Sequence, residues 1–354
     1  MEKIVLRGVT ISSGLVTILT CVCLYFFPGI KIDVPLEPEV SVVPEDKIEV
    51  QIQTQPPLDE IVKEKVVTDN YMTKLNIQLP EGIHGGQVSI SNNYLTQIVT
   101  VRFEKGVEDY VEKYRVFGNS DFIASVEYYL DGESGVLEIQ LDQVCELSYT
   151  YREDFLCIDF KDPHELYDKV IVVDAGHGGN DSGALQKKVY EKTINLAILK
   201  ELKALFDAQS DIKVYYTRTD DSNPTWAQRV ELANKAKADL FISIHNNSTA
   251  SGKLSAVSGT MVLYNEGDTS EHSSRRFAEL CLQEVTALTG SKNKGLMSGD
   301  YVYIVRNSQV PVALMEVGYM TNAKELEKLQ TVEYRKLVAQ GFYNAVMLAF
   351  EEGY

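Results

Sequence analysis

Residues 170–179 read Val-Ile-Val-Val-Asp-Ala-Gly-His-Gly-Gly, an apolar run that ends in an acidic residue and a glycine-rich turn. The β-branched run is typical of a buried strand, and the glycines permit a sharp turn after it. Downstream, helical and strand-like patterns alternate. We expect helices at residues 192–208, 224–237, 270–289 and about 333–351, and strands at 212–217, 240–244, 260–264, 301–305 and 312–317. This alternation predicts an α/β domain over residues 166–354, with a mixed or parallel sheet covered by helices on both faces.

Upstream of this domain, residues 76–165 show a β pattern. Alternating, β-branched and aromatic residues occupy six short segments, at 87–90, 97–103, 122–129, 135–141, 146–151 and 155–160. Turn-forming residues separate the segments. The pattern predicts a small β-sandwich domain that serves for binding or spacing, because no titratable cluster with catalytic spacing occurs in it.

The first thirty residues, 1–30, predict a membrane anchor. Lys3 and Arg7 precede an uncharged run at residues 8–30 that is long enough to cross a bilayer. Positive charge before the run and acidic sequence after it predict a single-pass protein of the cell membrane with its folded part outside. A cleaved signal peptide, which would give a secreted form, is the alternative, although no A-x-A-like site follows the run. Cys21 suggests a lipoprotein cysteine, but Thr20 is a poor residue for the position before it.

Residues 31–75 are rich in Pro, Glu, Asp, Val and Gln and lack a sustained helical or strand period. So little apolar surface cannot offset the entropy lost on folding, so this stretch is expected to be an extended linker. Such a linker would carry the folded part of the chain away from the membrane.

Composition limits the class of partner. The chain has 354 residues and a formal net charge of −17. A nucleic-acid-binding protein needs a basic face, so we expect no nucleic-acid partner. Outside the anchor run, Cys145, Cys157 and Cys281 are widely spaced and odd in number, which favours buried thiols over a disulfide framework, although Cys145 and Cys157 fall on neighbouring β segments.

Polar residues follow three of the predicted strands, where ligand sites collect in open α/β sheets. His177 follows the first strand, His245 follows the strand at 240–244, and Glu316 lies at the end of the strand at 312–317. Glu191 precedes the first long helix and is expected at the same edge. Two histidines and two carboxylates would thus converge on one side of the sheet.

Zinc favours such a set of side chains. Catalytic zinc sites have three protein ligands, commonly histidines with a carboxylate, and leave a fourth position for water. The metal lowers the pKa of that water, and a carboxylate that is not a ligand then takes its proton and passes it to the leaving amine.

Each residue also has a simpler interpretation. His245 would be a satisfied core histidine, and Glu191 a helix N-terminal charge favoured by the dipole. The glycine-rich turn resembles a phosphate loop but does not fit G-x-G-x-x-G. Glu316 follows four apolar residues, where an isolated buried carboxylate is costly.

Residues from about 169 to 350 resemble the zinc-dependent N-acetylmuramoyl-L-alanine amidases of the cell-wall hydrolase class. The resemblance lies in residues 172–179, 238–247 and 316–322, together with Arg229 followed by Ala233-Asn234. It implies one zinc ion on His177, Glu191 and His245, with Glu316 as the catalytic carboxylate. The role of Asn246 is open, because the family usually has a small residue there.

Two further expectations come from related families. The β region resembles, more weakly, the AMIN-type domains that precede such amidases and bind the wall. Some amidases carry an inserted helix that blocks the zinc between a strand and the following helix. Here residues 265–268 lead directly from one to the other, so we expect a zinc site that is not self-occluded.

The expected function is hydrolysis of the amide between the lactyl group of N-acetylmuramic acid and the L-alanine of the stem peptide in peptidoglycan. A zinc peptidase that cuts another amide of this polymer, and a non-catalytic wall-binding or amidase-regulating protein, are the alternatives. Arg306 would hold a stem-peptide carboxylate or form a structural ion pair, while Tyr303 and Tyr319 would line the cleft or pack. Oligomeric state is left open.

Overall fold

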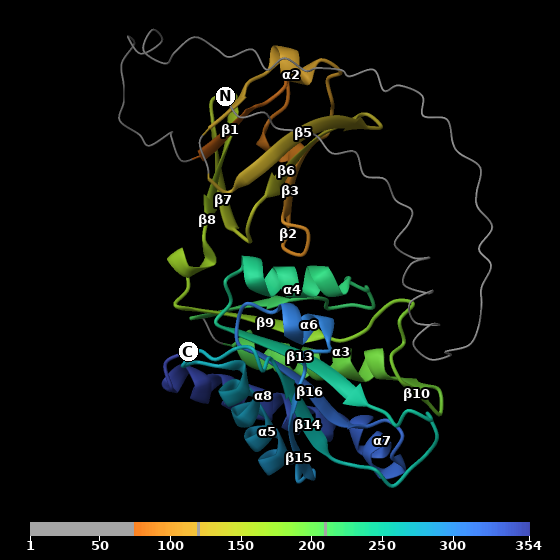
Figure 1. Ribbon diagram of the computed structural model, residues 1–354. Helices are drawn as coiled ribbons and strands as arrows, with labels where there is room; N and C mark the ends of the chain where they lie inside the picture. Colours follow the sequence, from red (N-terminus) through yellow and green to blue (C-terminus); the bar gives the residue numbers. More distant parts are fainter. Residues whose placement is uncertain (1–73, 119–120, 209–210) are drawn as a thin grey trace, which may run out of the picture. The chain divides into compact units, whose positions relative to one another are not determined.

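The computed structural model describes residues 74–118, 121–208 and 211–354 (Figure 1). The predicted anchor at residues 1–30, and the linker as far as residue 73, lie outside the described residues. Within the described ranges, no helix has the length and apolar character needed to cross a bilayer.

The β region contains two four-stranded antiparallel sheets. One has the order β4-β1-β8-β7, built from β4 (Val116–Phe117), β1 (Lys74–Gln78), β8 (Phe155–Lys161) and β7 (Glu146–Arg152). The other has the order β2-β3-β6-β5, built from β2 (Val88–Asn93), β3 (Ile98–Phe103), β6 (Ser134–Leu141) and β5 (Ile123–Asp131). Alternate residues of both sheets enter one core, because side chains of a strand point in turn to its two faces. That core includes Ile77, Val99, Val101, Ile139 and Ile158.

All six predicted β segments of this region are strands. The first strand, β1, begins at Lys74, two residues before the predicted start of the domain. Short helices complete the region: η3 (Gly85–Gln87), α2 (Tyr110–Lys113) and η4 (Pro163–Glu165). Cys145, Cys157 and Cys281 are buried thiols, as predicted.

The second region is a mixed six-stranded sheet with the order β12-β9-β13-β16-β14-β15. Its strands are β9 (Lys169–Ala175), β12 (Ile212–Tyr216), β13 (Leu240–Asn247), β14 (Thr260–Tyr264), β15 (Asn293–Ser298) and β16 (Val312–Tyr319). Only the pair β14–β16 is antiparallel; the other neighbours are parallel. The fold class is therefore the predicted mixed α/β.

Helices cover both faces of this sheet. Ile171, Val173 and Ala175 of β9 pack in one core with α3 (Glu191–Phe206), α5 (Ser274–Thr289) and α8 (Val332–Glu351). The alternate residues Val170 and Val172 pack in a second core with α4 (Trp226–Lys235) and α6 (Tyr303–Asn307). Both faces of the central strands are buried, which explains their continuous apolar runs.

Residues 301–305 were predicted as a strand, and this prediction is wrong. They enter the helical turn α6, which begins at Tyr303. The exposed residues Tyr303 and Arg306 are three positions apart, with the buried Ile304 and Val305 between them, which is the spacing of a helical face. β-branched composition alone misled the prediction.

In this second region the sequence also left four elements unpredicted. β15 pairs with β14 as an edge strand, and its polar first residues give no strand pattern. The hairpin of β10 (Leu185–Gln186) and β11 (Val189–Tyr190) and the helix α7 (Ala323–Leu329) are too short to give a clear periodic signal.

Candidate metal centre and adjoining cleft

His177 lies in the turn that follows β9. Its backbone has a φ of 62°, and the next residue, Gly178, has a φ of 142°, a value that favours glycine. The side chain of His177 thereby points back to the sheet edge. Gly176 is required for a different reason: a Cβ there would overlap the imidazole ring of His245.

Two buried arginines hold this turn through its carbonyl oxygens. Arg229 donates to the oxygens of Ala175 and His177 at 2.8 and 2.9 Å. Arg218 donates to the oxygens of Ala175 and Gly176 at 2.7 and 3.0 Å. Asp174 is fully buried and forms an ion pair with Arg229 at 2.6 Å. Burial alone would raise the pKa of Asp174, but Arg229 and two hydroxyl donors hold it below its usual value.

Glu191 is the first residue of α3, and its carboxylate is almost completely buried. Its Oε2 accepts from the backbone N–H of Ala184 at 2.8 Å, and its Oε1 accepts from the backbone N–H of Asn246 at 3.0 Å. Burial alone would raise the pKa of Glu191, but His177 and His245 beside it outweigh burial and keep the pKa far below its usual value. The carboxylate is therefore ionised and fixed in direction.

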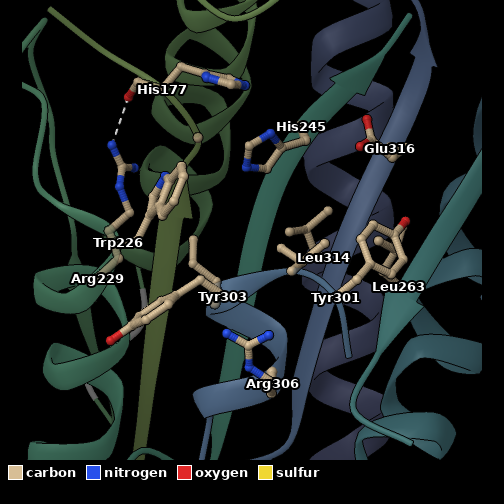
Figure 2. Close-up of a pocket in the computed structure, with 13 residues that line it drawn as sticks. His177, Trp226, Arg229, His245, Leu263, Tyr301, Tyr303, Arg306, Leu314 and Glu316 are labelled. Atoms are coloured by element: carbon tan, nitrogen blue, oxygen red, sulfur yellow. Dashed lines mark hydrogen bonds between the residues drawn. The ribbon is translucent and has the colours of Figure 1, made fainter. Parts of the chain in front are cut away.

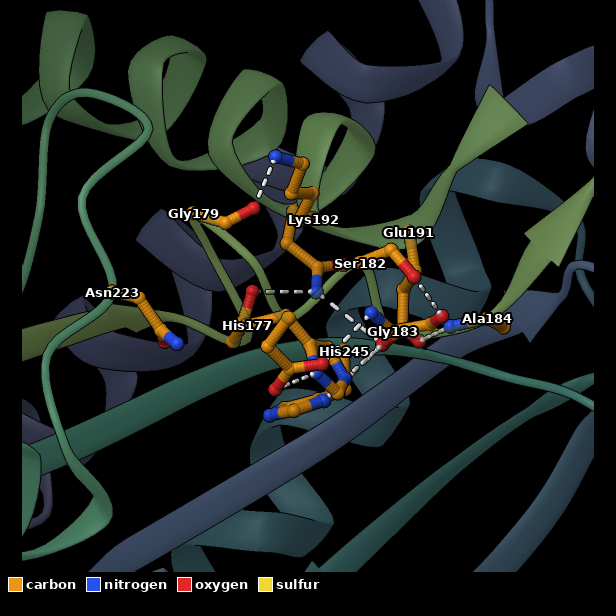
Figure 3. A network of polar contacts seen from close by, with 12 residues as sticks. His177, Gly179, Ser182, Gly183, Ala184, Glu191, Lys192, Asn223 and His245 are labelled. Carbon is orange, nitrogen blue, oxygen red and sulfur yellow. Dashed lines mark hydrogen bonds and ion pairs between the residues drawn. The ribbon is translucent and has the colours of Figure 1, made fainter. Parts of the chain in front are cut away.

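The three predicted ligands converge at one point (Figure 3). Both His177 Nε2 and His245 Nδ1 lie 3.2 Å from Glu191 Oε1. One ligand atom from each of the three residues can be chosen so that all lie within 4.8 Å of one another. Two imidazole nitrogens and a carboxylate oxygen with this spacing can hold one divalent metal ion.

A second carboxylate orients the first histidine. Asp181 Oδ2 lies 2.8 Å from His177 Nδ1, which leaves Nε2 toward the ligand position. Burial alone would lower the pKa of His177, but Glu191 and Asp181 raise it to about 9. A metal ion would take the place of that proton, because it binds only the neutral imidazole.

Asn246, whose role the sequence left open, supports Glu191 and does not lie in the cleft. Its backbone bonds Glu191, and its side-chain amide donates to Asn195 Oδ1 at 2.8 Å. Asn195 in turn donates to Glu191 Oε1 at 3.3 Å and to the oxygen of Gly176 at 3.1 Å. The two amides thus fix a ligand and the turn that carries His177.

Glu316 lies in β16 beside the three ligands. In the parallel register of β13 and β16, it is the residue opposite His245. Its Oε2 is buried and has no hydrogen-bond partner among the described residues. Burial raises the pKa of Glu316 to about 7, although His245 acts in the opposite direction. A carboxyl group with this pKa can both accept and donate a proton near neutrality.

A cleft of about 440 Å³ opens from these residues (Figure 2). Leu263 and Leu314 belong to its apolar part, and His245 and Glu316 lie at one end. The aromatic residues Trp226 and Tyr301, 64% and 67% exposed, also line it. No periodic signal in the sequence indicated these two aromatic residues, although Trp226 is the only tryptophan of the chain.

Of the other residues that the sequence singled out, some line the cleft and others do not. Tyr303 and Arg306 line the cleft. Tyr319 is 8% exposed, packs with Lys294 over its ring and does not line the cleft. Asp181 and Asn195 were missed, although their spacing gave a signal: each follows a ligand by four residues, Asp181 after His177 and Asn195 after Glu191.

A His/Glu/His cluster that could hold a metal ion, with a second carboxylate beside it at the edge of a mixed α/β sheet, is an arrangement typical of metal-dependent hydrolases. Comparison with known proteins gives the family. Residues 171–347 match the N-acetylmuramoyl-L-alanine amidase family. The chain belongs to this family, and the predicted resemblance is confirmed.

Relatives are found over the same half of the chain. The uncharacterized protein YqiI of Bacillus subtilis is 34% identical over 178 residues, which cover 50% of this chain and 83% of that protein. The N-acetylmuramoyl-L-alanine amidase LytC of the same organism is 32% identical over 181 residues, 51% of this chain but only 35% of LytC. The catalytic domain of CwlV, an N-acetylmuramoyl-L-alanine amidase from Bacillus (Paenibacillus) polymyxa, has 35% identity, a TM-score of 0.48 and coverage of 52% of this chain and 98% of that domain.

Proposed function

We propose that the chain is a zinc-dependent N-acetylmuramoyl-L-alanine amidase, which hydrolyses the amide between the lactyl group of N-acetylmuramic acid and the L-alanine of the stem peptide. One observation carries the proposal: the ligand atoms of His177, Glu191 and His245 lie within 4.8 Å of one another, with Glu316 beside them. Hydrolysis of an unactivated amide at neutral pH needs both an activated water and a proton donor for the leaving amine.

Different residues would supply the activated water and the proton donor. His177, Glu191 and His245 would hold the zinc, which supplies a water of lowered pKa and a positive charge at the amide carbonyl. Glu316 Oε2, buried and unpartnered, accepts the proton of the attacking water. The same carboxyl then donates that proton to the nitrogen of L-alanine as the C–N bond breaks. Asp181 keeps the His177 ring in place throughout.

The site lacks the inserted helix that some amidases carry. β14 ends at Tyr264 and α5 begins at Ser274, and the connection contains no helix. We therefore expect the purified enzyme to act on wall without an activating partner. Inactivity on sacculi until a partner is added would contradict this part of the proposal.

The test is digestion of purified peptidoglycan with parallel metal analysis. The enzyme should contain about one zinc per chain, lose activity with a chelator and regain it with zinc. Mass spectrometry should find peptide-free glycan and stem peptides that begin with L-alanine. Shortened stem peptides on intact glycan would instead indicate a peptidase, and wall binding without any product would indicate a non-catalytic protein. His177→Ala should abolish cleavage, with His272→Ala, outside the cleft, as the matched control.

The segments that precede the α/β domain suggest where the enzyme acts. An uncharged N-terminal run would hold the enzyme at the outer face of the membrane, the linker would give it reach, and the β region would bind wall. Membrane fractionation of the full chain and of a chain that starts at residue 31 checks the anchor, and sedimentation of residues 74–165 with sacculi checks wall binding.

A further inference from the structure

Two arginines line the cleft, and their hydrogen bonding differs. Arg229 is buried, and its three nitrogens make five hydrogen bonds, to Pro224, Asp174, Ala175, His177 and Asn223. A guanidinium group has five N–H donors, so Arg229 has none to spare. Its role is structural.

Arg306 is nearly unpaired. Among the described residues it makes one hydrogen bond, from Nη1 to the backbone oxygen of Asp300 at 3.3 Å. No carboxylate within the described ranges comes within ion-pair distance of it, which excludes a structural ion pair there. Four of its donors are therefore available to a ligand.

The setting of Arg306 favours binding of an anion. Figure 2 shows its guanidinium directed into the cleft between Tyr303 and Tyr301, with Leu314 between it and His245. Arg306 is exposed and lines the cleft, so a carboxylate that enters the cleft can reach its guanidinium. The chain as a whole has a formal net charge of −17, so attraction of an anion to the cleft depends on a local positive group such as this guanidinium.

The proposed substrate carries an anion near the bond that is cut. In a stem peptide whose second residue is glutamate joined through its γ-carboxyl, the α-carboxylate is the first free anion beyond L-alanine. One extended residue spans roughly 3.5 Å. A carboxylate one residue beyond the scissile amide therefore lies close to the reacting atoms, and Arg306 lines the same cleft as His245 and Glu316.

We propose that Arg306 binds the α-carboxylate of the second stem-peptide residue and makes the enzyme prefer the carboxylate over its amide. This inference rests on the proposed function and deepens it. A planar guanidinium fork matches a carboxylate in a bidentate manner, whereas a carboxamide offers one acceptor and no charge. Arg306 thus selects between walls whose second residue is free or amidated.

The experiment uses two soluble muramyl tripeptides that differ only in whether the α-carboxyl of the second residue is free or amidated. The wild-type enzyme and Arg306→Gln are compared by kcat/KM on both. Loss of a charged hydrogen-bond pair should lower kcat/KM roughly 10- to 100-fold on the free acid. On the amidated peptide the two enzymes should agree within about threefold, and Arg306→Lys should lie between them on the free acid.

Arg275→Gln is the matched control, because Arg275 is exposed on α5 and outside the cleft. Selective loss on the free acid supports the inference. An equal loss on both peptides, no loss on either, or a loss confined to the amidated peptide overturns it. Failure of the wild-type enzyme to release L-alanine-terminated peptide from either substrate is a separate result, which overturns the proposed function itself.

Discussion

Glu316 of β16 stands opposite His245 of β13 in the parallel register of the sheet. Neighbouring parallel strands place such residues side by side, so the ligand and the proposed proton carrier are fixed by the same backbone ladder. One of the pair offers a nitrogen to the metal position, and the other presents a buried oxygen without a partner. This difference suits His245 to the proposed role of metal ligand and Glu316 to the proposed role of proton carrier.

Replacing Glu316 by Gln should remove catalysis and leave metal binding intact, because the amide has similar size but cannot carry the proton. Loss of a general acid–base group lowers kcat by about 10²- to 10⁴-fold. The measurement is the rate of amide cleavage in a soluble muropeptide together with the zinc content of each variant. A Glu316→Gln enzyme that retains more than a tenth of wild-type kcat would show that another group moves the proton.

Activity should fall as the pH is lowered through about 7, because burial raises the pKa of Glu316 to that value and only the ionised form accepts a proton from water. A bound cation favours the charged carboxylate and moves this limb to lower pH. The profile of kcat/KM from pH 5 to 9, with zinc content measured at each pH, tests the prediction. A kcat/KM that rises as the pH is lowered, at constant zinc content, would exclude Glu316 as the base.

Stability of the metal-free protein should also depend on Glu316. Its pKa rises from 4.5 to about 7 on folding, so the folded state binds the proton more tightly. The stabilisation is present below pH 4.5 and is lost as the pH rises through 7, since the carboxylate must then ionise in a buried place. Glu316→Gln should therefore raise the free energy of unfolding at pH 8 by on the order of 3 kcal/mol and change it little at pH 4.5. Urea denaturation with chelator present measures both values; a variant less stable than wild type at pH 8 would contradict the argument.

The sequence predicts the sheet and the convergence of the site residues for a definable reason. Strands buried on both faces appear as unbroken apolar runs, so polar residues that follow or interrupt such a run are visible in the chain itself: His177 follows β9, His245 lies within β13 and Glu316 within β16. Glu191 is visible only as the start of a long amphipathic helix. The segment at 301–305 failed because a five-residue helical turn gives no period to detect.

Supporting residues could not be predicted in the same way. Asn246 and Asn195 meet across 51 positions of sequence, and neither residue type indicates its partner. Arg306 keeps free N–H donors because the fold places no carboxylate of the described residues beside it, and the sequence alone does not show this. The sequence therefore predicts which polar side chains converge more readily than which residues orient them.

Asp181→Asn should weaken metal binding while leaving all three ligands in place. Asp181 accepts from His177 Nδ1 and so fixes which nitrogen faces the metal, and loss of such a partner usually lowers metal affinity about 10- to 100-fold. Zinc titration against a competing chelator gives the affinity. Asp220→Asn, an exposed carboxylate in a nearby loop, is the control and should match wild type. Equal zinc affinities for Asp181→Asn and the control would show that Asp181 does not contribute to metal binding.

Arg229 should be the residue whose loss harms both fold and site. Arg229→Met leaves Asp174 as a buried, uncompensated carboxylate, which should lower the free energy of unfolding by roughly 3–5 kcal/mol. Arg229→Lys keeps the charge, but its single nitrogen cannot reach both Asp174 and the oxygen of His177, so the turn loosens. The Lys variant should therefore retain more stability than the Met variant and still bind zinc more weakly than wild type. Urea denaturation with chelator separates the first effect, and zinc titration the second. A Lys variant with wild-type zinc affinity would show that the His177 turn holds its shape without this guanidinium.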